Sequence, residues 1–124
     1  MAVSQIAITQ IASGNVYLNT SVNATKDQVK ASSTVVYMIE VDNSANGAQA
    51  NWLKLYNLTS GNTTVGTSTP DMIVFLPAAA KYNLSIPQGV TFGTALTIAC
   101  VSDNGGTSGT TNPGAAVIAR IVYV

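Results

Sequence analysis

The chain has 124 residues, of which 8% are charged, and its five Lys/Arg balance five Asp/Glu. This length is typical of one domain, and zero net charge argues against nucleic-acid binding, which draws its affinity from several clustered basic side chains. With no His and one Cys, the composition excludes His-dependent catalysis, His-bearing or multi-thiolate zinc sites and intramolecular disulfides.

The first segment of the chain is apolar-rich and uncharged. It lacks a basic stretch followed by a compact apolar core, so we expect no signal peptide and synthesis in the cytoplasm. No run in the chain approaches the roughly 18 apolar residues of a membrane-spanning helix. Because terminal strands often cover exposed sheet edges of a partner, we expect Ala2 to Ile11 to form a contacting arm or strand. The contact residues expected there are Val3, Gln5, Ile6, Ile8 and Ile11.

Strand patterns dominate the rest of the chain. Apolar and polar residues alternate with period two, or form short apolar runs, between turns rich in Gly, Pro and Asn. The fold class predicted is all-β, a single jelly-roll-like β-sandwich of about eight antiparallel strands. One domain spans 1–124, with 1–14 as an N-terminal arm or edge strand. The expected strands are 5–12, 16–22, 34–42, 51–57, 72–76, 81–86, 96–101 and 115–124.

Several local features refine this prediction. Residues 24–31 contain one large apolar side chain and are expected to form a loop or a single turn. Asn46-Gly47 is a strong hairpin signal, and Pro87-Gln88-Gly89 predicts another turn. Alternation in the strand 34–42 predicts one shared face for Val35, Tyr37, Ile39 and Val41.

Two acidic patterns resemble functional sites. Asp42 to Gly47 has oxygen ligands at alternate positions and Gly at the sixth, as in a calcium loop, but the twelfth position is Leu53 instead of a carboxylate. A plain hairpin turn is therefore favoured. Glu40 and Asp42 lie about 7 Å apart along one strand face, which suits a hydrolase pair, although an exposed strand end explains them equally well.

The reactive and aromatic side chains have structural explanations too. Cys100 has apolar neighbours, which predicts a buried, inert thiol. Trp52, Lys54 and Tyr56 share one strand face and could form an aromatic, sugar-binding surface, although packing is the commoner use of such residues. We therefore expect no catalytic residues, no metal, no cofactor and no enzymatic activity.

Two segments carry a resemblance to a known family. One is Trp-Leu-Lys-Leu-Tyr-Asn at 52–57 with Val-Gly-Thr-Ser-Thr-Pro at 65–70, and the other is Leu-Pro-Ala at 76–78 with the Gly-Val-Thr-Phe region of 86–99. In this order they resemble small structural proteins of tailed-bacteriophage virions, over roughly 52–124. The resemblance implies a β-sandwich virion component whose motifs are structural and carry no chemistry.

The expected function follows from this resemblance and from the low charge. We expect a capsid decoration, or cement, protein located in the virion, assembling as a homotrimer and stabilising the lattice of the major capsid protein by interface burial. Its partners would be its own copies and the major capsid protein, with no nucleic acid and no membrane. The alternative is a tail, neck or fibre component that binds host surface glycan.

Overall fold

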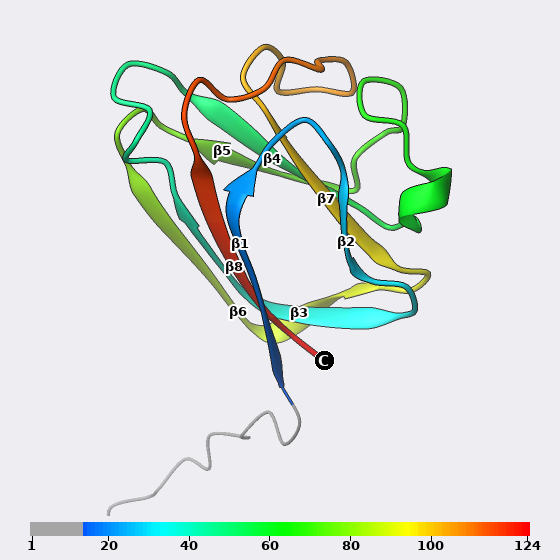
Figure 1. The fold of residues 1–124 in the computed structure, drawn as a ribbon. Helices are drawn as coiled ribbons and strands as arrows, with labels where there is room; N and C mark the ends of the chain where they lie inside the picture. The colour runs from blue at the N-terminus through cyan, green and yellow to red at the C-terminus, as the bar shows by residue number, and fades with distance from the viewer. Residues whose placement is uncertain (1–13) are drawn as a thin grey trace, which may run out of the picture.

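The computed structural model describes residues 14–124, which form eight strands and one short 3-10 turn (Figure 1). The strands are antiparallel and make two four-stranded sheets. The elements are β1 (Asn15–Val22), β2 (Asp27–Lys30), β3 (Thr34–Asp42), β4 (Asn51–Tyr56), η1 (Ser60–Asn62), β5 (Met72–Leu76), β6 (Lys81–Phe92), β7 (Leu96–Val101) and β8 (Val117–Tyr123).

The strand order is that of a jelly roll. Sheet A has the order β1-β8-β3-β6, and sheet B has the order β2-β7-β4-β5. The pairs β4–β5, β3–β6, β2–β7 and β1–β8 are nested inside one another, as in an antiparallel ribbon folded over into two layers. The predicted all-β sandwich with a jelly-roll arrangement is therefore confirmed.

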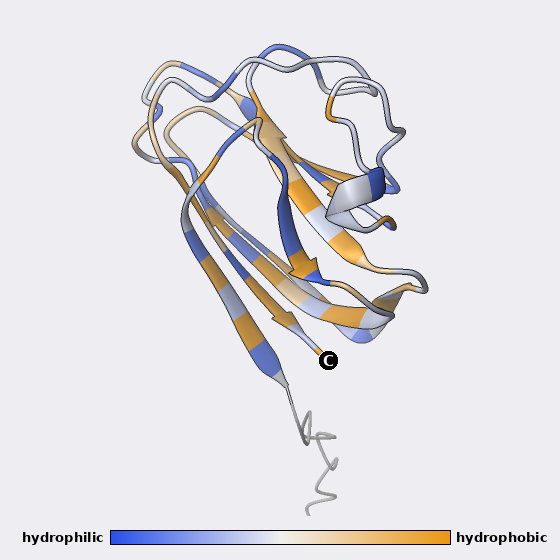
Figure 2. Ribbon diagram, turned by 45° about the vertical axis from the view of Figure 1, so that its right-hand side comes forward, coloured by the Kyte–Doolittle hydropathy of each residue, from blue (hydrophilic) through white to orange (hydrophobic). Residues whose placement is uncertain are grey.

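The hydrophobic core lies between the two sheets. Inward-facing side chains alternate with outward-facing ones along most strands, so that apolar and polar bands succeed each other in Figure 2. All six residues of β7 are buried, because the outer face of sheet B is also covered. The core cluster contains Val22, Val36, Ile39, Val41, Leu53, Leu55, Val74, Leu76, Phe92, Leu96, Ile98, Cys100, Val117, Ala119 and Ile121.

Strand boundaries agree with the prediction where local patterning is strong. The structure places β3, β5 and β7 at the predicted residues, and β1, β4 and β8 within a residue or two of them. The expectation of a loop over 24–31 is wrong for Asp27–Lys30, which forms β2 because it pairs with the edge of β7. The predicted strand 5–12 lies outside the described residues.

A bulge changes the face of β3 halfway along. The register with β6 and β8 shifts between Val36 and Met38, so that Val36 and Ile39 both point into the core. The predicted single face from Val35 to Val41 is therefore wrong. Opposite this bulge β6 continues through Pro87 to Gly89, where a turn was expected. A proline is tolerated there because β6 is an edge strand.

Gly89 permits this path. Its φ is +74°, and a Cβ on it would lie 2.4 Å from Cγ1 of Val35. A side chain at this position would clash as well as strain the backbone.

The connection after β3 crosses from sheet A to sheet B, so the predicted hairpin at Asn46-Gly47 is wrong. Three buried amides hold this connection. Asn43 Oδ1 accepts hydrogen bonds from Nδ2 of Asn46 (2.9 Å) and Asn51 (2.7 Å), and Asn43 Nδ2 donates to the Pro77 carbonyl at 2.9 Å. Asn46 Oδ1 also accepts from the Ala115 N–H at 2.8 Å. These bonds join three chain segments at one end of the sandwich.

Across residues 14–124, no helix is long and apolar enough to cross a membrane.

Candidate interaction surfaces

The outer face of sheet A exposes large apolar side chains. Val16 and Leu18 on β1 are 65% and 52% exposed. The register places Val16 beside Val122 and Leu18 beside Arg120, and Val122 lies beside Met38 on β3. We call this surface the sheet A face, and its residues are Val16, Leu18, Met38, Glu40, Ile118, Arg120 and Val122.

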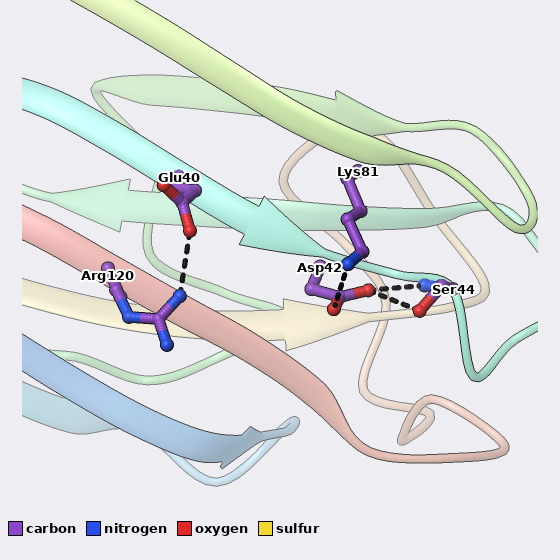
Figure 3. A network of polar contacts seen from close by, with 5 residues as sticks. All are labelled: Glu40, Asp42, Ser44, Lys81 and Arg120. Carbon is purple, nitrogen blue, oxygen red and sulfur yellow. Dashed lines mark hydrogen bonds and ion pairs between the residues drawn. The ribbon is translucent and has the colours of Figure 1, made fainter.

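Charged residues on sheet A are arranged as ion pairs (Figure 3). Arg120 Nη1 lies 2.7 Å from Glu40 Oε1, and Lys81 Nζ lies 3.7 Å from Asp42 Oδ2. Asp42 Oδ1 also accepts hydrogen bonds from the Ser44 backbone and hydroxyl, which lower the pKa of Asp42. Each carboxylate considered as a hydrolase pair therefore has a cationic partner of its own. The pairs neutralise the charges on this part of the sheet.

Loops cover the outer face of sheet B, in contrast to sheet A. Lys54 Nζ donates to the Ser108 carbonyl at 2.6 Å. Gly105 lies against the ring of Trp52, where a Cβ would come within 2.5 Å of Nε1. Lys54 and Tyr56 are fully buried. The predicted surface of Trp52, Lys54 and Tyr56 is therefore not an exposed platform, because chain distant in sequence packs over two of its three members.

Burial changes the protonation equilibria on this covered face. Desolvation lowers the pKa of Lys54, and the nearby Asp103 carboxylate counteracts part of that change. Desolvation also raises the pKa of Tyr56, whose hydroxyl has no hydrogen-bond partner among the described residues. In the core behind this face, burial raises the pKa of the Cys100 thiol to about 12, as expected for an inert cysteine.

One apolar patch remains exposed on sheet B, at its β5 edge. Ile73 and Phe75 are 37% and 52% exposed. The Trp52 and Phe75 rings have centroids 5.8 Å apart and are tilted by 50°. Phe75 was not singled out from the sequence. Alternation along β5 could have placed it on the outer face of sheet B, because β5 pairs in register with β4 and Phe75 lies beside Trp52.

The calcium-like segment has other roles. Asp42 is bound to Ser44 and Lys81, and the side-chain oxygens of Asn43 and Asn46 accept hydrogen bonds within the protein. Among residues 14–124, no group of three or more His, Cys, Asp or Glu could hold a metal ion. The side-chain oxygens that suggested a cation site therefore accept hydrogen bonds that stabilise this connection.

The expected partner contacts Val3, Gln5, Ile6, Ile8 and Ile11 lie outside the described residues. No protein-family model, curated protein or solved structure matches the chain.

Proposed function

We propose that this protein is a structural component of a bacteriophage virion: a capsid decoration protein that assembles as a homotrimer and stabilises the lattice of the major capsid protein. The observation that carries this proposal is the exposed apolar row of the sheet A face, with Val16 65% and Leu18 52% exposed. Contiguous apolar patches on the surface of a protein often mark the site of contact with another molecule. The virion assignment itself comes from the resemblance of residues 52–124 to small phage structural proteins.

The chemistry of the sheet A face supports a protein partner. Burying apolar surface stabilises a complex by about 25 cal/mol per Å², and the Glu40–Arg120 pair leaves no unpaired charge at the centre of the face. A trimer would present three such faces at once. Simultaneous engagement of three modest contacts raises the overall affinity without requiring any one contact to be strong. The sheet A face is thus the proposed contact with the capsid lattice.

The test is binding to capsids assembled without the protein. Purified wild type is expected to bind them saturably in a sedimentation assay and to increase their resistance to heat. Leu18→Lys should reduce binding at least tenfold, whereas Thr69→Lys adds the same charge at an exposed threonine in the loop before β5 of sheet B and should bind like wild type. Light scattering on each variant reports the oligomeric state. No binding by wild type, or equal binding by both variants, would overturn the proposal.

One observation favours the second function, a tail, neck or fibre component that binds glycan. Trp52 and Phe75 form an aromatic pair at the β5 edge, and Phe75 is half exposed. Aromatic rings of this kind can stack on apolar faces of sugars. Since Trp52 is the single tryptophan, titration with host surface glycans should shift its fluorescence in wild type and not in Phe75→Ser. An unchanged spectrum in wild type would remove this function.

A further inference from the structure

The four sheet edges differ in how they are protected against pairing with another chain. Exposed backbone N–H and C=O groups of an edge strand accept a further strand unless charge, proline, a bulge or a short length prevents it. The edges of sheet A are β1 and β6, and those of sheet B are β2 and β5. Three of the four carry such devices.

β2 has four residues and contains Asp27 and Lys30. β6 begins at Lys81, contains Pro87 and has an irregular register with β3. β1 changes register with β8 between Asn19 and Val22. The features of β2 and β6 shorten or disrupt the straight stretch that an added strand would need. The shift in β1 leaves a regular stretch over Asn15–Asn19, but that stretch begins and ends with a polar Asn.

β5 has none of them. Its sequence is Met-Ile-Val-Phe-Leu, and it pairs with β4 in unbroken register over five residues. Within residues 14–124, the backbone of Ile73, Val74 and Phe75 makes no hydrogen bond outside the strand ladder. An apolar, uncharged and regular edge is the kind that recruits another strand.

We propose that the N-terminal segment of a neighbouring copy pairs with β5 and extends sheet B by a fifth strand. The inference deepens the proposed function, since it rests on the assembly of several copies. The segment 1–13 contains no charged residue, and Ile6 and Ile8 alternate with Ala7 and Thr9 as in a half-buried strand. It joins β1 through Gly14, and thirteen extended residues can span about 43–47 Å. A segment of that reach and composition can leave its own sandwich and pair with another.

The side-chain pattern suits this acceptor. In a strand paired with β5, Ile6 and Ile8 share one face and can cover the exposed Ile73 and Phe75. Backbone hydrogen bonds would supply affinity, and alternate side chains would supply specificity. The contact is heterologous, because the donor segment and the acceptor edge are different surfaces. Such a contact forms a closed ring when the rotation between copies is a whole fraction of a turn, and a rotation of one third gives the proposed trimer.

The test is disulfide trapping between two full-length variants with one introduced cysteine each, Ile8→Cys and Phe75→Cys, that carry tags of different mass. The native Cys100 is buried and should not react under native conditions. Mild oxidation of the mixture is expected to give the mixed dimer as the main covalent product. The control replaces Phe75→Cys with Leu18→Cys, which has the same 52% exposure on the other sheet, and should trap at least fivefold less.

Other occupants of the edge give other products. A dimer from Phe75→Cys alone, at a yield equal to the mixed dimer, would mean that two β5 strands pair and would overturn the proposal. An internal disulfide in the double variant, without the mixed dimer, would assign the edge to the chain's own segment and also overturn it. Failure of this inference is separable from failure of the proposed function, because capsid binding that survives without trapping at Phe75 refutes the strand pairing alone.

Discussion

The outer faces of the two sheets are opposites. On sheet B, Lys54, Tyr56, Thr97 and Ala99 are all buried, and the segments that follow β7 and β4 contact this face through the carbonyls of Ser108 and Leu58. On sheet A, the equivalent face exposes Val16 and Leu18 and carries its charges in pairs. The chain therefore completes one face by itself and leaves apolar surface uncovered on the other. Within residues 14–124, coverage by loops therefore distinguishes the two sheets more than their strand patterns do.

The largest effect should follow from removing the buried side chain at the centre of the covered face. Lys54→Ala removes a buried four-carbon stem and leaves the Ser108 carbonyl without its donor, so the free energy of unfolding should fall by about 2–4 kcal/mol. Chemical denaturation measures it. Lys54→Met keeps most of the stem and should cost less than about 1.5 kcal/mol. A loss below about 0.5 kcal/mol for the alanine variant would mean that the loop does not pack on Lys54.

The next effect should come from separating the loop from the sheet. Gly105→Ala places a methyl group within 2.5 Å of Trp52 Nε1, and the overpacking should cost about 1–3 kcal/mol. Fluorescence of the single tryptophan should shift to longer wavelength as the ring gains contact with water. Gly47→Ala is the control, because a Cβ there meets nothing within 4 Å. Equal effects of the two substitutions would contradict the close packing of the loop.

A smaller change of opposite sign is expected at Tyr56. Its hydroxyl is buried without a partner, so Tyr56→Phe should raise the free energy of unfolding by up to about 1 kcal/mol.

The same residue predicts a pH dependence. Because burial raises the pKa of Tyr56 above its ordinary value of 10, the unfolded chain loses this proton at lower pH than the folded chain. Stability due to this group is complete below pH 10 and is lost as pH rises further. The alkaline fall should therefore be less steep in Tyr56→Phe than in Tyr82→Phe, which alters an exposed phenol. Identical pH profiles would contradict the burial of Tyr56.

The smallest effect on the free energy of unfolding is expected on the sheet A face. Arg120→Ala removes the Glu40 ion pair, in which both side chains are more than a third exposed. Exposed pairs contribute about 0–1 kcal/mol, and this difference from wild type should vanish in about 1 M salt. A larger loss, or one insensitive to salt, would show that Arg120 is packed instead of exposed.

Much of the fold could be predicted from local sequence patterns. The boundaries of β3, β5 and β7 follow from runs of β-prone side chains between turn residues. Asp27–Lys30 could not be recognised in this way, because its only large apolar residue is Val29 and its strand conformation depends on pairing with β7. The change of face in β3 could not be predicted from the sequence either, because a bulge depends on how two strands pair and not on one strand alone.

The surfaces were harder to predict than the strands. The sequence placed Trp52, Lys54 and Tyr56 on one side of a strand, but it could not reveal that Gly105 and Ser108, some fifty residues later, pack over them. The exposed pair of Val16 and Leu18 had no distinguishing pattern either, because half-buried strands alternate in the same way whichever side is free. Long-range packing decides which face is covered.

The amide cluster at the β3–β4 connection has a consequence for chemical ageing. An asparagine followed by glycine cyclises and deamidates readily, because glycine leaves the next backbone nitrogen free to attack the side-chain carbonyl. Here the Asn46 amide is held by hydrogen bonds to Asn43 and Ala115 and is almost completely buried. Deamidation must then wait for this end of the sandwich to open. The rate of deamidation at Asn46 is thereby tied to the stability of one turn.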